Sequence, residues 1–474
     1  MRFPIVVRRP RAPLFRLWLC AALLPVPALH AAGLHAVVHA DPAPMSGAGE
    51  RDHASATGAD EPSLSIGPEA ADDSGPTLDA EALVRNVLQR NPGITAMQAA
   101  ADAAGAKVES AGALEDPMLS YAIAPRTAGA YPTPNQNVQV SQAIPWPGTL
   151  DLRVRAARAE AQSADRQIDD TRLRLAAAAR SVYAEWYYVH RALAVNAENR
   201  VLLKRLEAVA ETAYASGQAP QQDVLQAEVE LTRLQNQRFE LERRRRVVKA
   251  KINTLLDQPP DAPVAAPGDL PAPRPLPVYA TLQAAALAGY PMLQSLDARL
   301  AASRERVALA NKDNYPQFKL MAGYNSLWDE PAKRLVVGVA INIPFGGNHR
   351  GEVGEAHAHA REAEAKLADA RAQLLGDLDQ SLAAAVQATD TIELDDKKLL
   401  PLSKLNLQAA EADYSGGNGD FLKLITAEQQ YLTAKLELAR ARADWFTQLA
   451  SLDYQTGGAL LHTPADAPIQ DVTP

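Results

Sequence analysis

The side chains that most often bind metals or transfer protons are scattered along this chain. His357 and His359 are two positions apart, but residues i and i+2 of a helix do not share a face, and no third ligand is evident beside them. The single cysteine, Cys20, excludes a disulfide and a thiolate metal cluster. We therefore expect no metal site and no cofactor.

Signatures of catalysis and of nucleotide binding are also lacking. The sequence has no phosphate-binding loop, no glycine-rich dinucleotide motif after a strand, no zinc-protease motif and no nucleophile elbow. The excess of 56 acidic over 48 basic residues disfavours a nucleic-acid partner. We expect the basic run Arg243–Arg246 to pair with neighbouring glutamates or to line a channel. The sequence thus predicts no enzyme and no nucleic-acid binding.

The N-terminus indicates export. A basic segment with Arg2, Arg8 and Arg9 precedes the apolar run 17–29, which has the length of a signal-peptide core. We predict a signal peptide over residues 1–40 and a flexible lead-in over residues 41–77, which is rich in Ala, Asp, Ser, Gly and Pro. No later segment offers the ~18 uninterrupted apolar residues of a membrane helix.

Landmark residues recur about 200 positions apart, which predicts an internal duplication. The pairs are Asn91-Pro92 with Tyr290-Pro291, Asp116-Pro117 with Tyr315-Pro316, Pro145-Trp146-Pro147-Gly148 with Pro344-Phe345-Gly346-Gly347, Tyr214-Ala215-Ser216-Gly217 with Tyr414-Ser415-Gly416-Gly417, and Ala227-Glu228 with Ala427-Glu428. We predict a first repeat over residues 78–257, a Pro-rich joint over 258–277, a second repeat over 278–458 and a C-terminal tail over 459–474.

Each predicted repeat has the same order of elements. A helix ends before a proline, because proline lacks the N–H that a helix needs, and two strands with period-2 alternation follow. A very long helix then begins after a Pro/Gly junction; at 1.5 Å per residue it spans roughly 100 Å. A glycine-containing turn leads into a shorter returning helix. The expected helices are 94–113, 149–215 and 221–256 in the first copy, and 292–311, 348–415 and 421–455 in the second, with a kink or break at Pro401.

The strands predict how the chain meets a membrane. Leu335, Val337 and Val339 alternate with smaller residues, so one face of the hairpin is apolar. Four strands cannot close a barrel, and open edges in lipid leave backbone groups unpaired at a cost of several kcal/mol each. Three chains would supply twelve strands. The predicted fold is mainly α with a transmembrane β portion: a tandem strand–strand–long-helix repeat, forming a trimeric 12-stranded β-barrel that continues into a periplasmic α-helical barrel.

Over about residues 78–458 these features resemble the TolC-like outer-membrane factors. The resemblance rests on the tandem repeat, the strand-to-helix junctions and the tip motifs Tyr214-x-x-Gly217 with Asp223-Val224-Leu225-x-Ala227, and Tyr414-x-x-Gly417 with Ala427-Glu428. It implies a homotrimer set in outer-membrane lipid and extending into the periplasm. The helix tips would contact a periplasmic adaptor that is coupled to an inner-membrane RND-type pump.

Within this family the chain looks most like the heavy-metal efflux branch, which is CusC- and CzcC-like. The residues that carry this likeness are Asp116-Pro117-Met118, the Pro145–Gly148 junction and the segment 323–330. The resemblance implies a passive exit channel of a tripartite efflux system, with heavy-metal cations or small toxic compounds as cargo.

The same resemblance assigns candidate roles to three sets of residues. The adaptor-contacting helix tips are Tyr214, Gly217, Asp223, Tyr414, Gly416 and Gly417. The candidate pore gate is formed by Asp223, Asp420, Lys423 and Thr426, where Lys423 and Thr426 stand at positions that are often acidic in relatives. The strand-to-helix junctions are Pro145, Pro147, Gly148, Pro344 and Gly347.

Two other functions stay open on the sequence. A periplasmic coiled-coil adaptor or scaffold would also account for the signal peptide and the long helices. A type I secretion duct in the outer membrane would share the whole predicted architecture. Four alternating strands in two symmetric pairs disfavour the adaptor, which has no need of them.

Overall fold

The computed structural model describes residues 77–124, 135–326, 331, 334–344, 348–416 and 419–461. The predicted signal peptide 1–40 and all but the last residue of the lead-in 41–77 lie outside the described residues, as do Gly347, Gly417 and most of the tail 459–474. The described residues belong to one structural unit of the chain.

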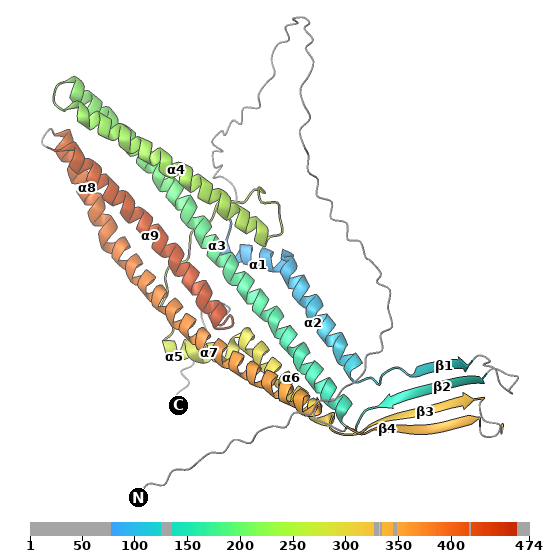
Figure 1. The fold of residues 1–474 in the computed structure, drawn as a ribbon. Helices are drawn as coiled ribbons and strands as arrows, with labels where there is room; N and C mark the ends of the chain where they lie inside the picture. The colour runs from blue at the N-terminus through green and yellow to red at the C-terminus, as the bar shows by residue number, and fades with distance from the viewer. Residues whose placement is uncertain are drawn as a thin grey trace, which may run out of the picture. The chain divides into compact units, whose positions relative to one another are not determined.

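Helices and strands follow one another in the same order in both halves of the described chain (Figure 1). The first copy contains α1 (Ala80–Arg90), α2 (Pro92–Ala111), β1 (Met118–Ala124), β2 (Asn135–Ile144), α3 (Thr149–Ala215) and α4 (Gln221–Leu255). The second contains α5 (Tyr279–Gly289), α6 (Pro291–Lys312), β3 (Gln317–Asn325), β4 (Leu335–Asn342), α7 (Asn348–Leu394), the π-helix η2 (Asp395–Leu399), α8 (Leu400–Ser415) and α9 (Phe421–Gln455). The short helices α1 and α5 were not predicted from the sequence.

The π-helix explains how two long helices of different length occupy equivalent places. The run Asn348–Ser415 is one residue longer than α3, and a π-turn accommodates one extra residue within a continuous helix. Pro401 follows directly and is tolerated in the first turn of α8, where its missing N–H matters least. The irregularity expected at Pro401 is therefore a π-helical turn rather than a break.

The four strands form one antiparallel sheet in the order β1-β2-β3-β4. The register places Leu119, Val140, Ala322 and Val337 in one row across the sheet, so the apolar residues of all four strands share a face. The large apolar residues of this face are exposed: Leu119, Tyr121, Ile123, Val138, Val140, Leu320, Tyr324, Leu335, Val337, Val339 and Ile341. Small and polar residues such as Ser120, Gln139 and Gly323 occupy the opposite face. The alternation predicted from the sequence is confirmed.

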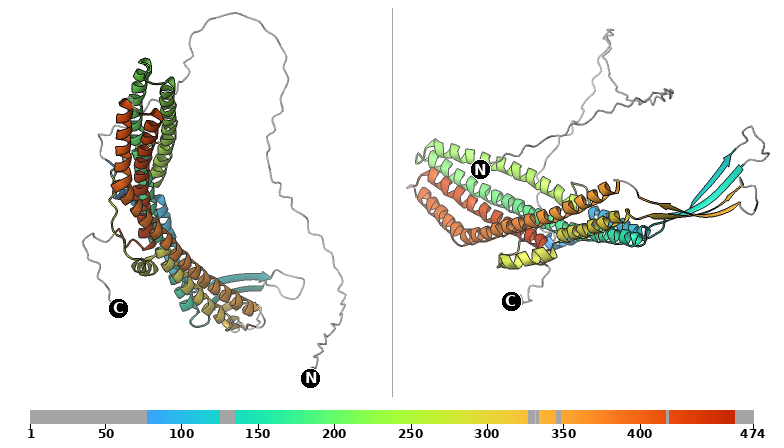
Figure 2. Two further views of the ribbon diagram at one scale, coloured as in Figure 1. Left: turned by 90° about the vertical axis from the view of Figure 1, so that its left-hand side faces the viewer. Right: turned by 60° about the horizontal axis from the view of Figure 1, so that its bottom comes forward.

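Long helices run side by side away from the sheet (Figure 2). Within the first copy α4 packs against α3, and α9 packs both against α7 and α8 of its own copy and against α3 of the other. The main core joins Tyr183 and Trp186 of α3 to Trp445 and Phe446 of α9. Burying each such aromatic side chain stabilises the fold by ~2–3 kcal/mol. None of the described helices is long and apolar enough to span a membrane.

Buried polar contacts fix the ends of the repeats to this core. Arg180 of α3 contacts Glu81 of α1 and Asp453 of α9, with N–O distances of 2.8 and 3.1 Å. The Tyr183 hydroxyl donates to the carbonyl oxygens of Leu78 and Gly268, at 2.9 and 3.1 Å. These bonds hold the Pro-rich joint against the start of the first copy, where it pairs as an isolated β-bridge.

Candidate functional site: the helix tips and the strand-to-helix junctions

The first helix tip is a tight turn between α3 and α4. Gly217 has φ of 73°, a left-handed conformation that favours glycine. The Gln218 N–H donates a hydrogen bond to the Ala213 carbonyl oxygen at 2.8 Å, which closes the turn. The side chain of Tyr214, one turn earlier, is about half exposed. The turn therefore presents Tyr214 to solvent, where a partner can reach it.

The second tip, between α8 and α9, is built differently. Asp420 caps α9, because its carboxylate accepts the Leu422 N–H at 2.9 Å. At Gly419 a Cβ would lie 2.6 Å from the backbone nitrogen of Tyr414, so the chain passes too close for a side chain. Gly416 is right-handed, with φ of −80°, and its N–H bonds to Ala412. Asp420 is therefore already engaged as a helix cap.

A hydrogen bond joins the two tips. The buried Tyr414 donates its hydroxyl to Asp223 Oδ2 at 3.1 Å, and its ring packs on Phe421 with centroids 5.2 Å apart. Burial, together with the nearby Asp223 charge, raises the pKa of Tyr414 to about 12, so the phenol keeps the proton that it donates. The fold thus brings together two of the predicted site residues, which lie 191 positions apart in the sequence.

The other candidate gate residues lie apart from this bond. Lys423 is exposed, and Thr426 donates its hydroxyl to the Leu422 carbonyl of its own helix at 2.7 Å. A cavity of about 610 Å³ opens beside the bond between the tips, and Arg205, Asp223, Asp420 and Tyr414 are among its lining residues. Lys423 and Thr426 do not line it, so the structure divides the predicted gate residues between two locations.

Below the tips lies the buried carboxyl of Glu428, a residue of the Ala427-Glu428 motif. Glu428 of α9 is almost fully buried, and its Oε1 atom has no hydrogen-bond partner within the described part of the chain. Desolvation by burial raises its pKa to about 7; the amide of Asn199 opposes this shift and the Glu230 charge adds to it. Glu230 itself is satisfied by Gln429 at 3.0 Å and Arg233 at 2.7 Å.

The first strand-to-helix junction is held by stacked aromatic rings. Trp146 stacks on Tyr315 and Phe318 of the second copy, with ring centroids 5.0 and 6.0 Å apart. Gly148 has φ of 83° and caps α3, between Pro145-Trp146-Pro147 and the helix. At the second junction Pro344 is described and Gly347 is not. The junction therefore also joins the two copies.

Two of the three histidines of α7, His349 and His359, pair with acidic neighbours on the same helix. His359 Nδ1 lies 3.3 Å from Glu362 Oε2, and His349 Nδ1 lies 3.1 Å from Glu352 Oε2. Within the described ranges no group of three or more His, Cys, Asp or Glu is arranged to hold a metal ion.

Comparison with known proteins identifies the architecture. Residues 282–458 match the family model described as outer membrane efflux protein. The chain is similar to the outer-membrane channel OprN (TM-score 0.71, 20% identity, 80% of this chain and 90% of that chain covered). It is also similar to the outer membrane protein VceC from Vibrio cholerae (0.68, 19%, 80% and 96%) and to CusC (0.68, 15%, 80% and 92%). A comparison with curated proteins gave no match.

The chain therefore has the fold of these outer-membrane proteins, and its second half carries the efflux-protein signature. The resemblance inferred from the sequence is confirmed at that level. Its placement in the CusC- and CzcC-like branch stays a prediction.

Proposed function

We propose that this protein is the outer-membrane exit channel of a tripartite efflux system. The observation that carries the proposal is the amphipathic sheet: a row of exposed large apolar side chains covers one face, and small or polar residues cover the other. Apolar-out and polar-in alternation suits a wall between lipid and an aqueous pore. The sheet leads directly into α3, a helix of 67 residues that extends the channel into the periplasm.

The open edges of the sheet support a homotrimer. Among the described residues β1 pairs with β2 alone and β4 with β3 alone, so each outer strand has one unpaired edge. Unpaired backbone groups in lipid cost several kcal/mol each. Pairing β4 of one chain with β1 of the next removes both edges, and three chains then close a twelve-stranded barrel around one pore.

The helix tips are the proposed contact with the periplasmic adaptor, which couples the channel to an inner-membrane RND-type pump. The tip residues are Tyr214, Gly217, Asp223, Tyr414, Gly416 and Gly417, and the proposed gate comprises Asp223, Asp420, Lys423 and Thr426. The exposed Tyr214 and the cavity between the tips support this assignment. The channel is passive, since the pump supplies the energy. The proposed cargo is heavy-metal cations or small toxic compounds.

Planar bilayer recording tests this function. We expect the purified protein, added to a bilayer in detergent, to produce discrete conductance steps, because each trimer forms one pore. Protein purified without detergent as a stable monomer would contradict the proposal. Release from membranes by a salt wash would instead favour the periplasmic adaptor.

A second prediction concerns the bond between the tips. Tyr414→Phe should raise the ratio of open to closed time by about 5- to 30-fold, since a hydrogen bond to a carboxylate contributes ~1–2 kcal/mol to the closed arrangement. Tyr214→Phe is the matched control, because Tyr214 is exposed at the equivalent position. Equal open times for both variants and the unmodified channel would refute a role for this bond.

A further inference from the structure

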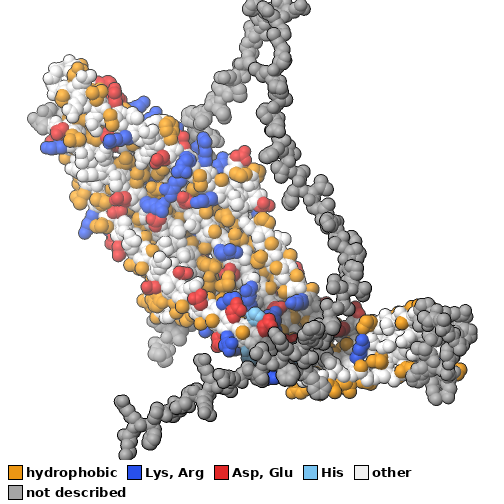
Figure 3. Space-filling view, in the orientation of Figure 1, with side chains coloured by type: hydrophobic (Ala, Val, Ile, Leu, Met, Phe, Trp, Pro, Cys, Tyr) orange, Lys and Arg blue, Asp and Glu red, His pale blue; other side chains and the backbone are white. Residues whose placement is uncertain are grey.

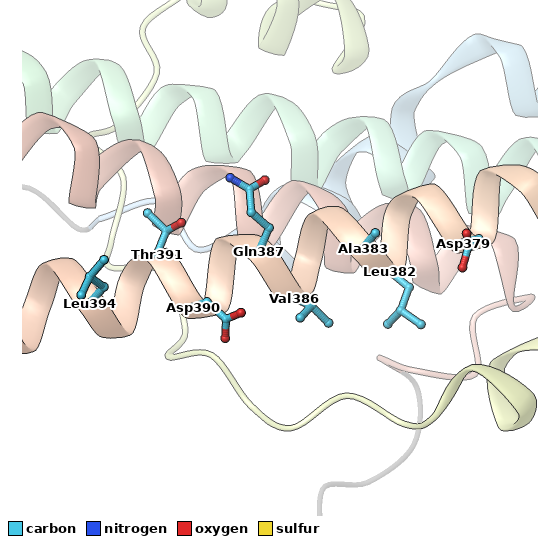
Figure 4. A pocket seen from close by; sticks show the side chains of 8 residues that line it. All are labelled: Asp379, Leu382, Ala383, Val386, Gln387, Asp390, Thr391 and Leu394. Atoms are coloured by element: carbon cyan, nitrogen blue, oxygen red, sulfur yellow. The ribbon is translucent and has the colours of Figure 1, made fainter.

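The four strands carry a single charged side chain, Lys319 of β3. Hydrophobic and uncharged side chains cover most of the visible part of the strands, whereas acidic and basic side chains are interspersed over the helices (Figure 3). Helix α7 is an example of the second kind: Asp379 and Asp390 lie at the two ends of a shallow hollow of about 580 Å³ on its surface (Figure 4). Lys319 is therefore an isolated charge in an otherwise uncharged sheet.

Lys319 lies on the small and polar face of the sheet. It pairs with Ala143 of β2 and with Ala340 of β4. Gly323, four positions along β3, is on the same face, because alternate residues of a strand point to the same side. In the proposed channel this face lines the aqueous pore. Each chain therefore contributes one ammonium group to the wall of the lumen.

The charge of Lys319 is accessible to solvent. Its side chain is partly exposed, and the alanines paired with it on both sides are too short to cover it. Lys319 forms no salt bridge with any residue that the structure describes. The acidic residues Glu115 and Asp116 come before β1 and are exposed. The ammonium group of Lys319 is thus free to act on ions that pass along the face.

Lys319 also lies near the entrance to the sheet. It is the third residue of β3, close to the point where the strands join the helices (Figure 1). In the proposed channel, cargo that leaves the helical part passes this level before it enters the rest of the barrel.

We propose that Lys319 sets the ion preference of the barrel, and that its three copies around the pore favour anions over cations. Rings of Lys or Arg side chains select anions in membrane pores, and substitutions on the lumen face of a barrel tune its selectivity. Of the cargo classes proposed above, anionic or neutral small compounds fit this lumen better than bare metal cations. This inference rests on the proposed trimeric channel and narrows its cargo.

Reversal potentials in planar bilayers under a KCl gradient test this role, because they give the ratio of K⁺ to Cl⁻ permeability. Lys319→Gln should raise this ratio by about twofold at about 0.1 M salt, since it removes three positive charges from the lumen. At about 1 M salt the difference should nearly disappear, because the Debye length falls from about 10 Å to about 3 Å.

A charge returned to the same face should reverse the effect. Adding Ala340→Lys to Lys319→Gln should restore the original ratio, because Ala340 lies directly opposite Lys319 on β4. The matched control is Lys312→Gln, which removes a lysine close to the same end of the sheet. Lys312 Nζ lies 5.4 Å from the centroid of the Tyr315 ring, which belongs to the aromatic stack at the junction. This control should leave the ratio unchanged.

The outcomes separate this inference from the proposed function. Normal conductance steps with the same low-salt permeability ratio for Lys319→Gln and the unmodified channel would overturn the role of Lys319 and leave the channel standing. An equal rise for Lys312→Gln would also contradict it, since selectivity would then follow net charge rather than the lumen. Absence of conductance steps from the unmodified protein would overturn the channel itself.

Discussion

Replacing Arg180 by alanine should destabilise the fold by about 3–5 kcal/mol, the loss typical of breaking a buried ion pair. Arg180 is almost fully buried on α3 and donates to both carboxylate oxygens of Glu81, at 2.8 and 2.9 Å, and to Asp453 at 3.1 Å. Without Arg180 the Asp453 carboxylate stays buried and loses its charged partner. It then keeps the hydrogen bonds from the N–H groups of Leu460 and Leu461. Both α1 and the turn after α9 would lose their ionic contact with α3.

Thermal unfolding followed by far-ultraviolet circular dichroism in detergent measures this loss. The matched control is Arg172→Ala on the same helix, since Arg172 is about half exposed and lies 3.9 Å from Asp169. An exposed pair of this kind contributes at most ~1 kcal/mol. Similar melting temperatures for the two variants would show that the buried cluster contributes little to stability.

The second large effect is expected at Glu428, where stability should depend on pH. Burial raises the pKa of Glu428 from its ordinary value near 4.5 to about 7. The folded protein therefore holds this proton more tightly than the unfolded chain does. The stabilisation is fully present below pH 4.5 and is lost as pH rises through 7. Above that pH the ionised carboxyl should destabilise the interface between the two helical pairs by roughly 3 kcal/mol.

Glu428→Gln removes the ionisable group and should flatten this dependence. We expect the variant and the unmodified protein to have similar melting temperatures at pH 5, with the variant more stable at pH 8. Glu228→Gln is the control, because Glu228 occupies the equivalent position on α4 and is exposed. If both proteins lose stability in parallel between pH 5 and 8, the dependence arises from other groups.

Several elements could be read from the sequence because local chemistry decides them. Pro117 and Pro316 limit how far the preceding helices can extend, since proline lacks the N–H that a continuing helix needs, and α2 and α6 end before them at Ala111 and Lys312. Alternation along Leu335–Val339 needs only the period of a strand. The length of α3 follows from a long run without proline or a pair of glycines. The short helix α1 was not predicted, although its sequence carries local helix signals: Asp79 caps it, and the buried residues Leu83, Val84 and Val87 recur at helical spacing.

The sequence by itself determined the order of elements, the apolar face of the strands and the duplication that relates the two halves. The tertiary structure alone decided which residues at equivalent positions of the two repeats are buried and which contacts they make. Ala227-Glu228 and Ala427-Glu428 are identical in sequence, yet of the two glutamates only Glu428 is buried, because α9 packs on α3 of the other copy as well as on α7 and α8, whereas α4 packs mainly on α3. Tyr414 reaches Asp223 for the same reason, while Tyr214 stays exposed. Whether a side chain is buried depends on which face of its helix is covered by a helix distant in sequence, and the local sequence pattern does not determine that.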